Sequence, residues 1–184
     1  TLRDGARAFV ECPTGTGKTL GSLYAAAQVL AREPGLHDTP GPWLAFLTAR
    51  TVGQRAAVEA LAQLRAAGAH LRSLVLPARH RVCPCADRAG APGPEACEGC
   101  AAYYARRAAA LRALRARLDE AVVGPDDLVL AGRDHGVCPH ALARDLLPDA
   151  HVVVCDYHFA FRASTGAPAL GGARLLVDEA HRFA

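Results

Sequence analysis

The chain has 184 residues, 51% of them hydrophobic and 21% charged, so it is long enough to bury one sizeable core. No apolar run approaches the roughly 20 residues that a membrane-spanning helix needs, and no signal peptide is evident, which favours a cytoplasmic protein without a membrane partner. The net charge of +3 permits nucleic-acid binding but does not by itself argue for it.

A glycine-rich loop with a lysine lies near the start of the chain. Residues 8–10 predict a strand, residues 12–19 read CPTGTGKT, and residues 20–31 are helix-like. This order is typical of a loop whose backbone N–H groups bind nucleotide phosphates at the positive end of a helix. Lys18 is the only lysine among 21 lysines and arginines, and a flexible ammonium group suits a phosphate. Cys12 replaces the first glycine of the strict pattern. The expected contacts to phosphate and Mg²⁺ come from Gly15, Thr16, Gly17, Lys18 and Thr19, of which Thr19 holds the metal.

Strands and helices then alternate along the chain. The predicted elements are strands over residues 43–48, 71–76, 151–155 and 174–177 and a helix over residues 51–67. Such alternation indicates a parallel, doubly wound sheet of the α/β class. Residues 77–148 interrupt it.

The interrupting segment contains five of the seven cysteines. Clustered thiols in a cytosolic chain more often bind metal than form disulfides. Cys97 and Cys100 have the two-residue spacing that lets both sulfurs reach one centre, and Cys83 and Cys138 would complete four thiolates, although Cys85 competes with Cys83. Four thiolates suit zinc or an iron–sulfur cluster, and spacing alone does not choose between them.

An acidic pair follows the last predicted strand. Asp178 and Glu179 stand at the carboxyl end of residues 174–177, where open α/β sheets bind ligands. Alone, such a pair is more typical of a helix N-cap, but together with the phosphate loop it indicates hydrolysis. Asp178 would hold Mg²⁺ through water, and Glu179 would orient and deprotonate the water that attacks the γ-phosphate.

Five features occur in order: ECPTGTGKT at 11–19, TARTVGQ at 48–54, the cysteine-containing segment, CPH at 138–140 followed by VVCDYH at 153–158, and DEAH at 178–181. Together they resemble the amino-terminal motor half of the XPD/DinG family of iron–sulfur DNA helicases. The resemblance spans nearly the whole chain. It implies a RecA-like P-loop NTPase sheet with a cysteine-rich iron–sulfur insertion, divided into residues 1–76, 77–148 and 149–184.

The resemblance also implies cofactors and partners. These are ATP with Mg²⁺, single-stranded DNA or a forked duplex, and a 4Fe-4S cluster in place of zinc, with 5′ to 3′ movement driven by ATP and, in a bacterium, association with the nucleoid. The implied cluster ligands are Cys83, Cys97, Cys100 and Cys138. The segment that matches DNA-backbone contacts contributes Arg50, Thr51 and Gln54, although Arg50 also reads as a solvated strand end. His181 would link the nucleotide site to DNA movement.

Three side chains or segments near the cysteines have two interpretations. Residues 101–119 predict an amphipathic helix with a solvated arginine-rich side, and the alternative is a basic surface over which DNA strands part. His135 and His140 flank Cys138 and are candidates for supporting or replacing a ligand, although surface histidines are commoner.

Nothing after the acidic box supplies a second motor domain, so the chain as given is expected to be a fragment that does not translocate. Two other functions compete with the helicase. One is a zinc-stabilised nucleic-acid-binding module with a vestigial phosphate loop, which would not need Glu179. The other is a phosphate-loop kinase for a small molecule, in which a four-cysteine segment has no evident use.

Overall fold

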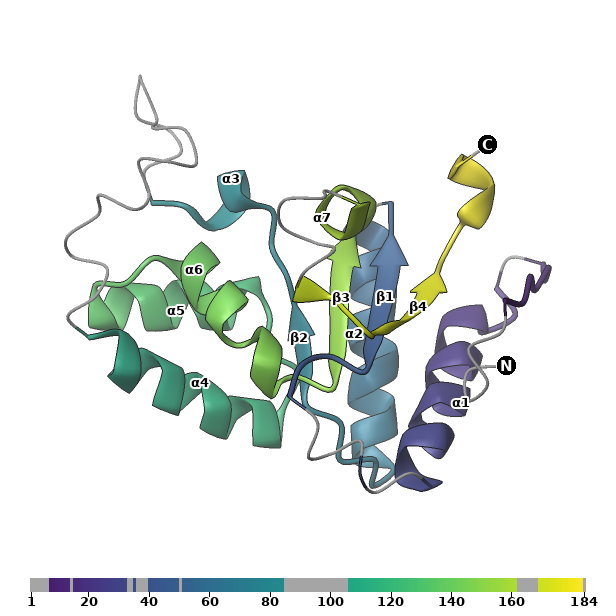
Figure 1. Ribbon diagram of the computed structural model, residues 1–184, viewed down its shortest axis with the longest axis horizontal. Helices are drawn as coiled ribbons and strands as arrows, with labels where there is room; N and C mark the ends of the chain where they lie inside the picture. The colour runs from purple at the N-terminus through teal and green to yellow at the C-terminus, as the bar shows by residue number, and fades with distance from the viewer. Residues whose placement is uncertain are drawn as a thin grey trace.

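The computed structural model describes residues 7–13, 15–32, 35, 40–49, 51–84, 106–161 and 169–183 (Figure 1). Its strands are β1 (Leu44–Thr48), β2 (Ser73–Val75), β3 (Val152–Asp156) and β4 (Arg174–Val177). Its α-helices are α1 (Lys18–Arg32), α2 (Thr51–Ala66), α3 (Arg79–Val82), α4 (Arg107–Glu120), α5 (Pro125–His135), α6 (Pro139–Asp145) and α7 (Tyr157–Phe161). Two short 3₁₀ helices are also described. One is η4 (Leu147–Asp149), which follows α6, and the other is η5 (Ala180–Phe183), which follows β4.

The four strands form one parallel sheet in the order β2-β3-β1-β4. β1 is central, and Leu44 is level with Val152 of β3 on one side and with Arg174 of β4 on the other. All five residues of β1 are buried, as expected for a parallel strand with both faces covered. The predicted α/β fold with a parallel sheet is therefore confirmed.

Helices cover both faces of the sheet. Side chains of β1 alternate, so that Leu44 and Phe46 join one hydrophobic cluster while Ala45 and Leu47 join the other. The first cluster includes residues of α1 and α2, and the second includes residues of α4, α5 and α6. Figure 1 shows α4, α5 and α6 grouped on the β2 side of the molecule, away from α1. No helix in the described ranges combines the length and apolar character needed to cross a bilayer.

Residues 8–10, predicted as the first strand, are not a strand. Phe9 is 92% exposed and Val10 is 79% exposed. These residues pair neither with β1, whose two edges are occupied by β3 and β4, nor with the outer edge of β4. The three residues are also too few to form a ladder that is stable without packing. The following helix begins at Lys18, two residues earlier than the pattern predicts.

The helices within residues 77–148 share a core with the sheet. Leu114 of α4, Leu128 of α5 and Leu142 of α6 lie in the same buried cluster as Leu47 and Val153. Iron–sulfur ligation of this segment and its boundaries at 77 and 148 remain predictions. The helical part of the segment nevertheless forms one layer of the α/β sandwich.

Candidate functional site

The glycine-rich loop closes around its own lysine. The ammonium group of Lys18 donates to the carbonyl oxygens of Cys12 at 2.9 Å and Pro13 at 3.1 Å. The hydroxyl of Thr16 also donates to the Pro13 carbonyl, at 2.8 Å. Backbone carbonyl oxygens of the loop thus hold the ammonium group of Lys18 at the start of α1. The first backbone N–H groups of a helix have no partner within that helix and give its amino end a partial positive charge.

Two of the loop glycines are required by backbone conformation. Gly15 has φ of +81° and Gly17 has φ of +75°, values that side chains rarely adopt. A Cβ at either position would meet nothing within 4 Å, so the constraint is conformational and not steric. Lys18 is exposed and Thr19 is half-buried at the first turn of α1, which leaves the predicted phosphate-binding groups open to solvent.

The acidic pair forms a turn at the carboxyl end of β4. The backbone N–H of Asp178 donates to the Leu47 carbonyl at 2.9 Å and so extends the ladder with β1 by one bond. The chain then turns, because Glu179 has φ of +53° and its N–H donates to Oδ1 of Asp178 at 3.1 Å. A left-handed glutamate costs on the order of 1 kcal/mol. Glu179 is exposed after this turn.

The acidic turn and the start of α1 lie at the same end of the molecule (Figure 1). His181 follows in η5 and is exposed. Thr48, Asp156 and Asp178 end or follow neighbouring strands, so their successors leave the sheet along one edge. The structure therefore places the acidic turn at the carboxyl edge, where open α/β sheets bind ligands.

Tyr157 is a residue to which the sequence pattern assigned no role. It begins α7 immediately after β3, and its hydroxyl donates to the backbone carbonyl of Asp178. Asp156 caps the same helix, since its Oδ1 accepts from the Phe159 N–H at 2.7 Å. The signal that could have found Tyr157 is its position directly after a buried strand at the ligand-binding edge.

The predicted DNA-contacting segment begins α2. Thr51 is exposed, Gln54 is half-buried, and Arg50 lies outside the described residues. The guanidinium group of Arg81, in α3, donates to the Thr51 hydroxyl at 3.2 Å. Arg81 thus adds a positive charge beside the predicted DNA-contacting segment. The sequence alone did not indicate this, because Arg81 is distant from Thr51 along the chain and is brought close to it only by folding.

Gly53 lets α2 approach β1 closely. A Cβ on Gly53 would lie 2.0 Å from Oγ1 of Thr48, which is buried at the end of β1. Only a residue without a side chain fits there. Gly53 therefore sets where Thr51 and Gln54 stand relative to the sheet edge.

Two of the four candidate cluster ligands lie within the described residues. Cys83 ends α3 and Cys138 precedes α6, and α3 is in contact with both α5 and α6. Both thiols are half-buried and neither forms a disulfide. Cys97 and Cys100, with the competing Cys85, lie outside the described residues. In the part of the chain that is described, no three His, Cys, Asp or Glu side chains group as a metal site, so the four-thiolate site remains a prediction.

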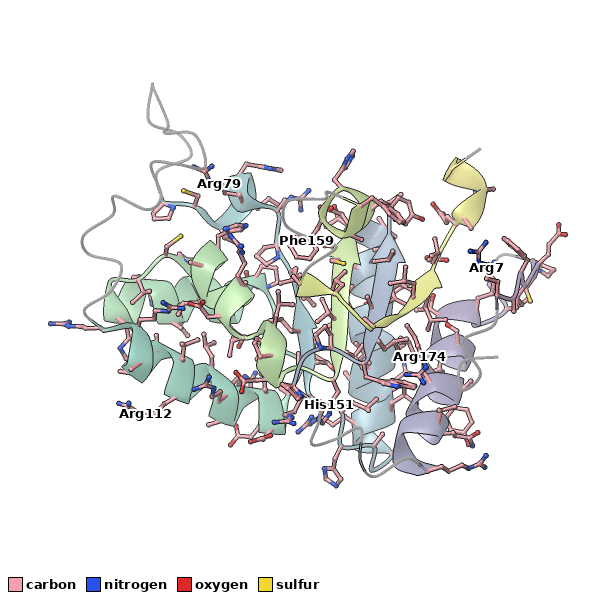
Figure 2. All side chains as sticks on the ribbon, viewed as in Figure 1. Arg7, Arg79, Arg112, His151, Phe159 and Arg174 are labelled. Carbon is pink, nitrogen blue, oxygen red and sulfur yellow. The ribbon has the colours of Figure 1, made fainter. Side chains whose placement is uncertain are left out.

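The surroundings of Cys138 favour a neutral histidine. Burial lowers the pKa of His140, and the charges of Arg144 and Arg79 lower it further. His140 therefore stays neutral at physiological pH. The other histidine that flanks Cys138, His135, is half-buried at the end of α5. Figure 2 shows Arg79 at the same end of the molecule as α7, and His151 at the opposite end.

Helix α4 carries ion pairs along its arginine-rich side. Arg107 pairs with Asp145, Arg115 pairs with Asp149 at 2.9 Å, and Arg117 pairs with Asp127 at 3.2 Å. These pairs tie α4 to α6, η4 and α5 and neutralise much of its charge. They favour the interpretation of an amphipathic helix with a solvated side over that of a basic surface for parting DNA strands.

Comparison with known proteins gives two findings. Residues 47–184 match the DEAD_2 family, a range that includes the five cysteines within residues 77–148 and the acidic turn but not the phosphate loop. The whole chain is also similar to the regulator of telomere elongation helicase 1 homolog of Drosophila melanogaster, with 23% identity over 229 aligned positions. That alignment covers 99% of this chain and 23% of the relative, so the chain spans about a quarter of the relative's length.

Proposed function

The chain belongs to the DEAD_2 family of XPD-like helicases, and we propose that it supplies the ATP-hydrolysing and DNA-contacting part of a DNA helicase motor. The observation that carries this proposal is the acidic turn at the carboxyl edge of a parallel sheet, at the same end of the molecule as a loop that holds a lysine ammonium group. Among P-loop proteins, this pairing of a phosphate loop with an acidic strand end serves phosphoryl transfer from a nucleotide.

ATP would replace contacts that the loop now makes with itself. The Lys18 ammonium would exchange the carbonyls of Cys12 and Pro13 for phosphate oxygens, while backbone N–H groups of Gly15, Thr16 and Gly17 point at the β-phosphate. Thr19 and Asp178 would hold Mg²⁺. Glu179, exposed beyond the strand, would orient and deprotonate the attacking water. His181 would transmit the state of this site to the bound DNA.

The DNA track is proposed to run along the start of α2. Thr51 and Gln54, with Arg50, would contact the phosphates of single-stranded DNA without reading its sequence. Arg81 supports this placement because it already donates to the Thr51 hydroxyl. We further propose 5′ to 3′ movement along a single strand or into a forked duplex.

A 4Fe-4S cluster is proposed in the segment between α3 and α6. Cys83 and Cys138 suit it chemically, since both are half-buried thiols at the ends of helices that contact each other and α5. Cys97 and Cys100 would complete the set. Such a cluster supplies four iron–thiolate bonds and a redox-active centre when bound. Iron analysis of protein purified without oxygen tests it: zinc in place of iron would favour the metal-stabilised binding module instead.

The nucleotide roles are tested with Lys18→Ala and Glu179→Gln in the protein as its gene encodes it. Lys18→Ala should abolish DNA-stimulated ATP hydrolysis and weaken binding of a fluorescent ATP analogue. Glu179→Gln should keep that binding while hydrolysis falls by about 10² or more, the scale expected for a lost general base. Arg133→Ala, which removes an exposed charge on α5, is the matched control and should change neither. Hydrolysis that persists in Lys18→Ala would rule out the proposed site.

A further inference from the structure

Tyr157 reaches across the end of the central strand. Tyr157 follows β3 and Asp178 follows β4, and β1 lies between these two strands in the sheet. The hydroxyl of Tyr157 nevertheless donates to the carbonyl oxygen of Asp178. One side chain therefore bridges two strands that do not pair with each other, at the edge where the acidic turn leaves the sheet.

The bonded carbonyl belongs to the peptide that starts the acidic turn. Asp178 is fixed on its amino side, where its N–H donates to Leu47 at 2.9 Å. Tyr157 fixes it on its carboxyl side, and the same peptide plane carries the N–H of Glu179, which donates to Oδ1 of Asp178 at 3.1 Å. Holding this plane determines the direction in which the chain enters Glu179.

Glu179 needs such support because of its own conformation. Its φ of +53° is unfavourable for a residue with a side chain, and neighbouring contacts must hold it there. Glu179 itself is exposed, and its N–H donates to Oδ1 of Asp178 within the same turn. The half-buried hydrogen bond from Tyr157 is a suitable source of the restraint.

Tyr157 is itself held firmly. It is the first residue of α7, which Asp156 caps through the Phe159 N–H at 2.7 Å. Tyr157 and Phe159 both pack against the hydrophobic cluster shared by the sheet and α4 to α6, and Figure 2 labels Phe159 beside α7. Because the helix cap and the packing against the core hold Tyr157 in place, the hydrogen bond from its hydroxyl restricts the motion of the acidic turn.

We propose that Tyr157 is a positioning residue for ATP hydrolysis, which holds the turn of Asp178 and Glu179 so that the Glu179 carboxylate faces the attacking water. This proposal rests on the proposed function of the acidic pair. Tyr157 touches neither nucleotide nor water in this role, and acts only through the Asp178 carbonyl.

The test is Tyr157→Phe, which removes the hydroxyl and keeps the packed ring. Loss of one hydrogen bond to the turn should lower kcat of DNA-stimulated hydrolysis about three- to tenfold, with KM and analogue binding unchanged. Hydrogen exchange of a peptide covering residues 175–181 should become faster. Tyr24→Phe is the matched control, since the Tyr24 hydroxyl accepts a bond from Gln28 on the surface of α1 and should affect none of these measurements.

The outcomes separate this proposal from the one on which it rests. An unchanged kcat in Tyr157→Phe, or an equal loss of kcat and analogue binding, would overturn the positioning role while wild-type hydrolysis stands. A wild-type protein without DNA-stimulated hydrolysis would overturn the proposed function. In that case the exchange measurement still decides whether Tyr157 orders the turn, because unchanged exchange at residues 175–181 refutes it and faster exchange supports it.

Discussion

Glu179 combines two properties at the scale of a single residue, a catalytic assignment and a left-handed backbone. The assignment could be made from sequence, because an acidic pair after an apolar strand has a recognisable spacing. The conformation could not be predicted, because φ at an exposed glutamate depends on the hydrogen bonds of Asp178 and Tyr157. These bonds link residues at the ends of β1, β3 and β4, which are far apart in the sequence. The position of this acidic pair after a strand was thus predictable, whereas the contacts that orient it were not, and its catalytic role stays a prediction.

Cys155 illustrates how burial alters the chemistry of one thiol. It lies in β3 with no exposed surface, and burial raises its pKa to about 12, with the charge of Asp156 adding to the shift. A rise from 9.0 to about 12 lowers the thiolate fraction about a thousandfold at neutral pH. Iodoacetamide should therefore modify Cys12, which is half-buried, well before Cys155, as peptide mass spectrometry would show. Comparable rates for the two in folded protein would contradict this.

The same thiol contributes to stability in a defined pH range. The unfolded chain ionises Cys155 near pH 9 and the folded chain only near pH 12, so its contribution is complete below about pH 9. It is lost as the pH rises toward 12, by about 1.4 kcal/mol per pH unit. Cys155→Ala should flatten this part of the alkaline stability curve in urea titrations. A variant with the wild-type slope would show that other groups cause the loss.

At the scale of elements, the contact between α2 and β1 depends on one glycine. Gly53→Ala gains helix propensity of up to about 1 kcal/mol, but its Cβ would lie 2.0 Å from the buried Thr48 hydroxyl. The overlap costs about 1–3 kcal/mol, so the variant should be less stable and should bind single-stranded DNA more weakly. Gly21→Ala in α1 is the matched control, since its Cβ meets nothing within 4 Å and the change should stabilise. Thermal unfolding and DNA titration check both, and a Gly53 variant as stable as the control would refute the packing argument.

A second glycine, Gly132 in α5, allows α5 to pack closely against the start of α6. A Cβ on Gly132 would lie 2.6 Å from the Pro139 ring and 2.7 Å from the Val137 carbonyl. Gly132→Ala should therefore push the start of α6 outward and displace Cys138, the residue before Pro139. We expect iron content per molecule to fall by half or more, on the order of the effect of a lost supporting contact at a metal site. Full iron occupancy in a folded Gly132→Ala protein would show that Cys138 is not a ligand or that α6 adapts.

Helices and strands could be predicted from the sequence where the local pattern of apolar residues alone specifies them. The runs around Leu44, Val153 and Leu176 are apolar, which predicts buried parallel strands. All three are parallel strands, but β4 lies at the edge of the described sheet and is only partly buried. Ala8 to Val10 has the same local character but is exposed and pairs with no strand of the described sheet. The helices α5 and α6 were missed, although Pro125 begins one and Gly136 ends it, because the surrounding cysteines suggested an irregular metal-bound segment.

At the scale of the whole molecule, the sheet and the helices of the cysteine-containing segment share one buried cluster, so we expect them to unfold together. Because α4, α5 and α6 contribute to the core that Leu47 and Val153 share, metal loss alone should not release them. Cys97→Ser and Cys100→Ser should therefore lose iron while residues 107–145 keep their hydrogen-exchange protection and unfolding stays a single transition. Cys155→Ala controls for the loss of a thiol outside the set. Iron retained in the Cys97 or Cys100 variant would exclude the proposed ligands.

Strand β4 has a practical consequence for handling these 184 residues in solution. Within the described sheet, β4 pairs on one side only, and Leu175 is 46% exposed. An open edge with an apolar side chain can pair with strands of other molecules, and the guanidinium group of Arg174 at the start of β4 lies over the Trp43 ring, 4.9 Å from its centroid. We therefore expect copies of these 184 residues to associate through the edge of β4 as their concentration rises, which light scattering would show.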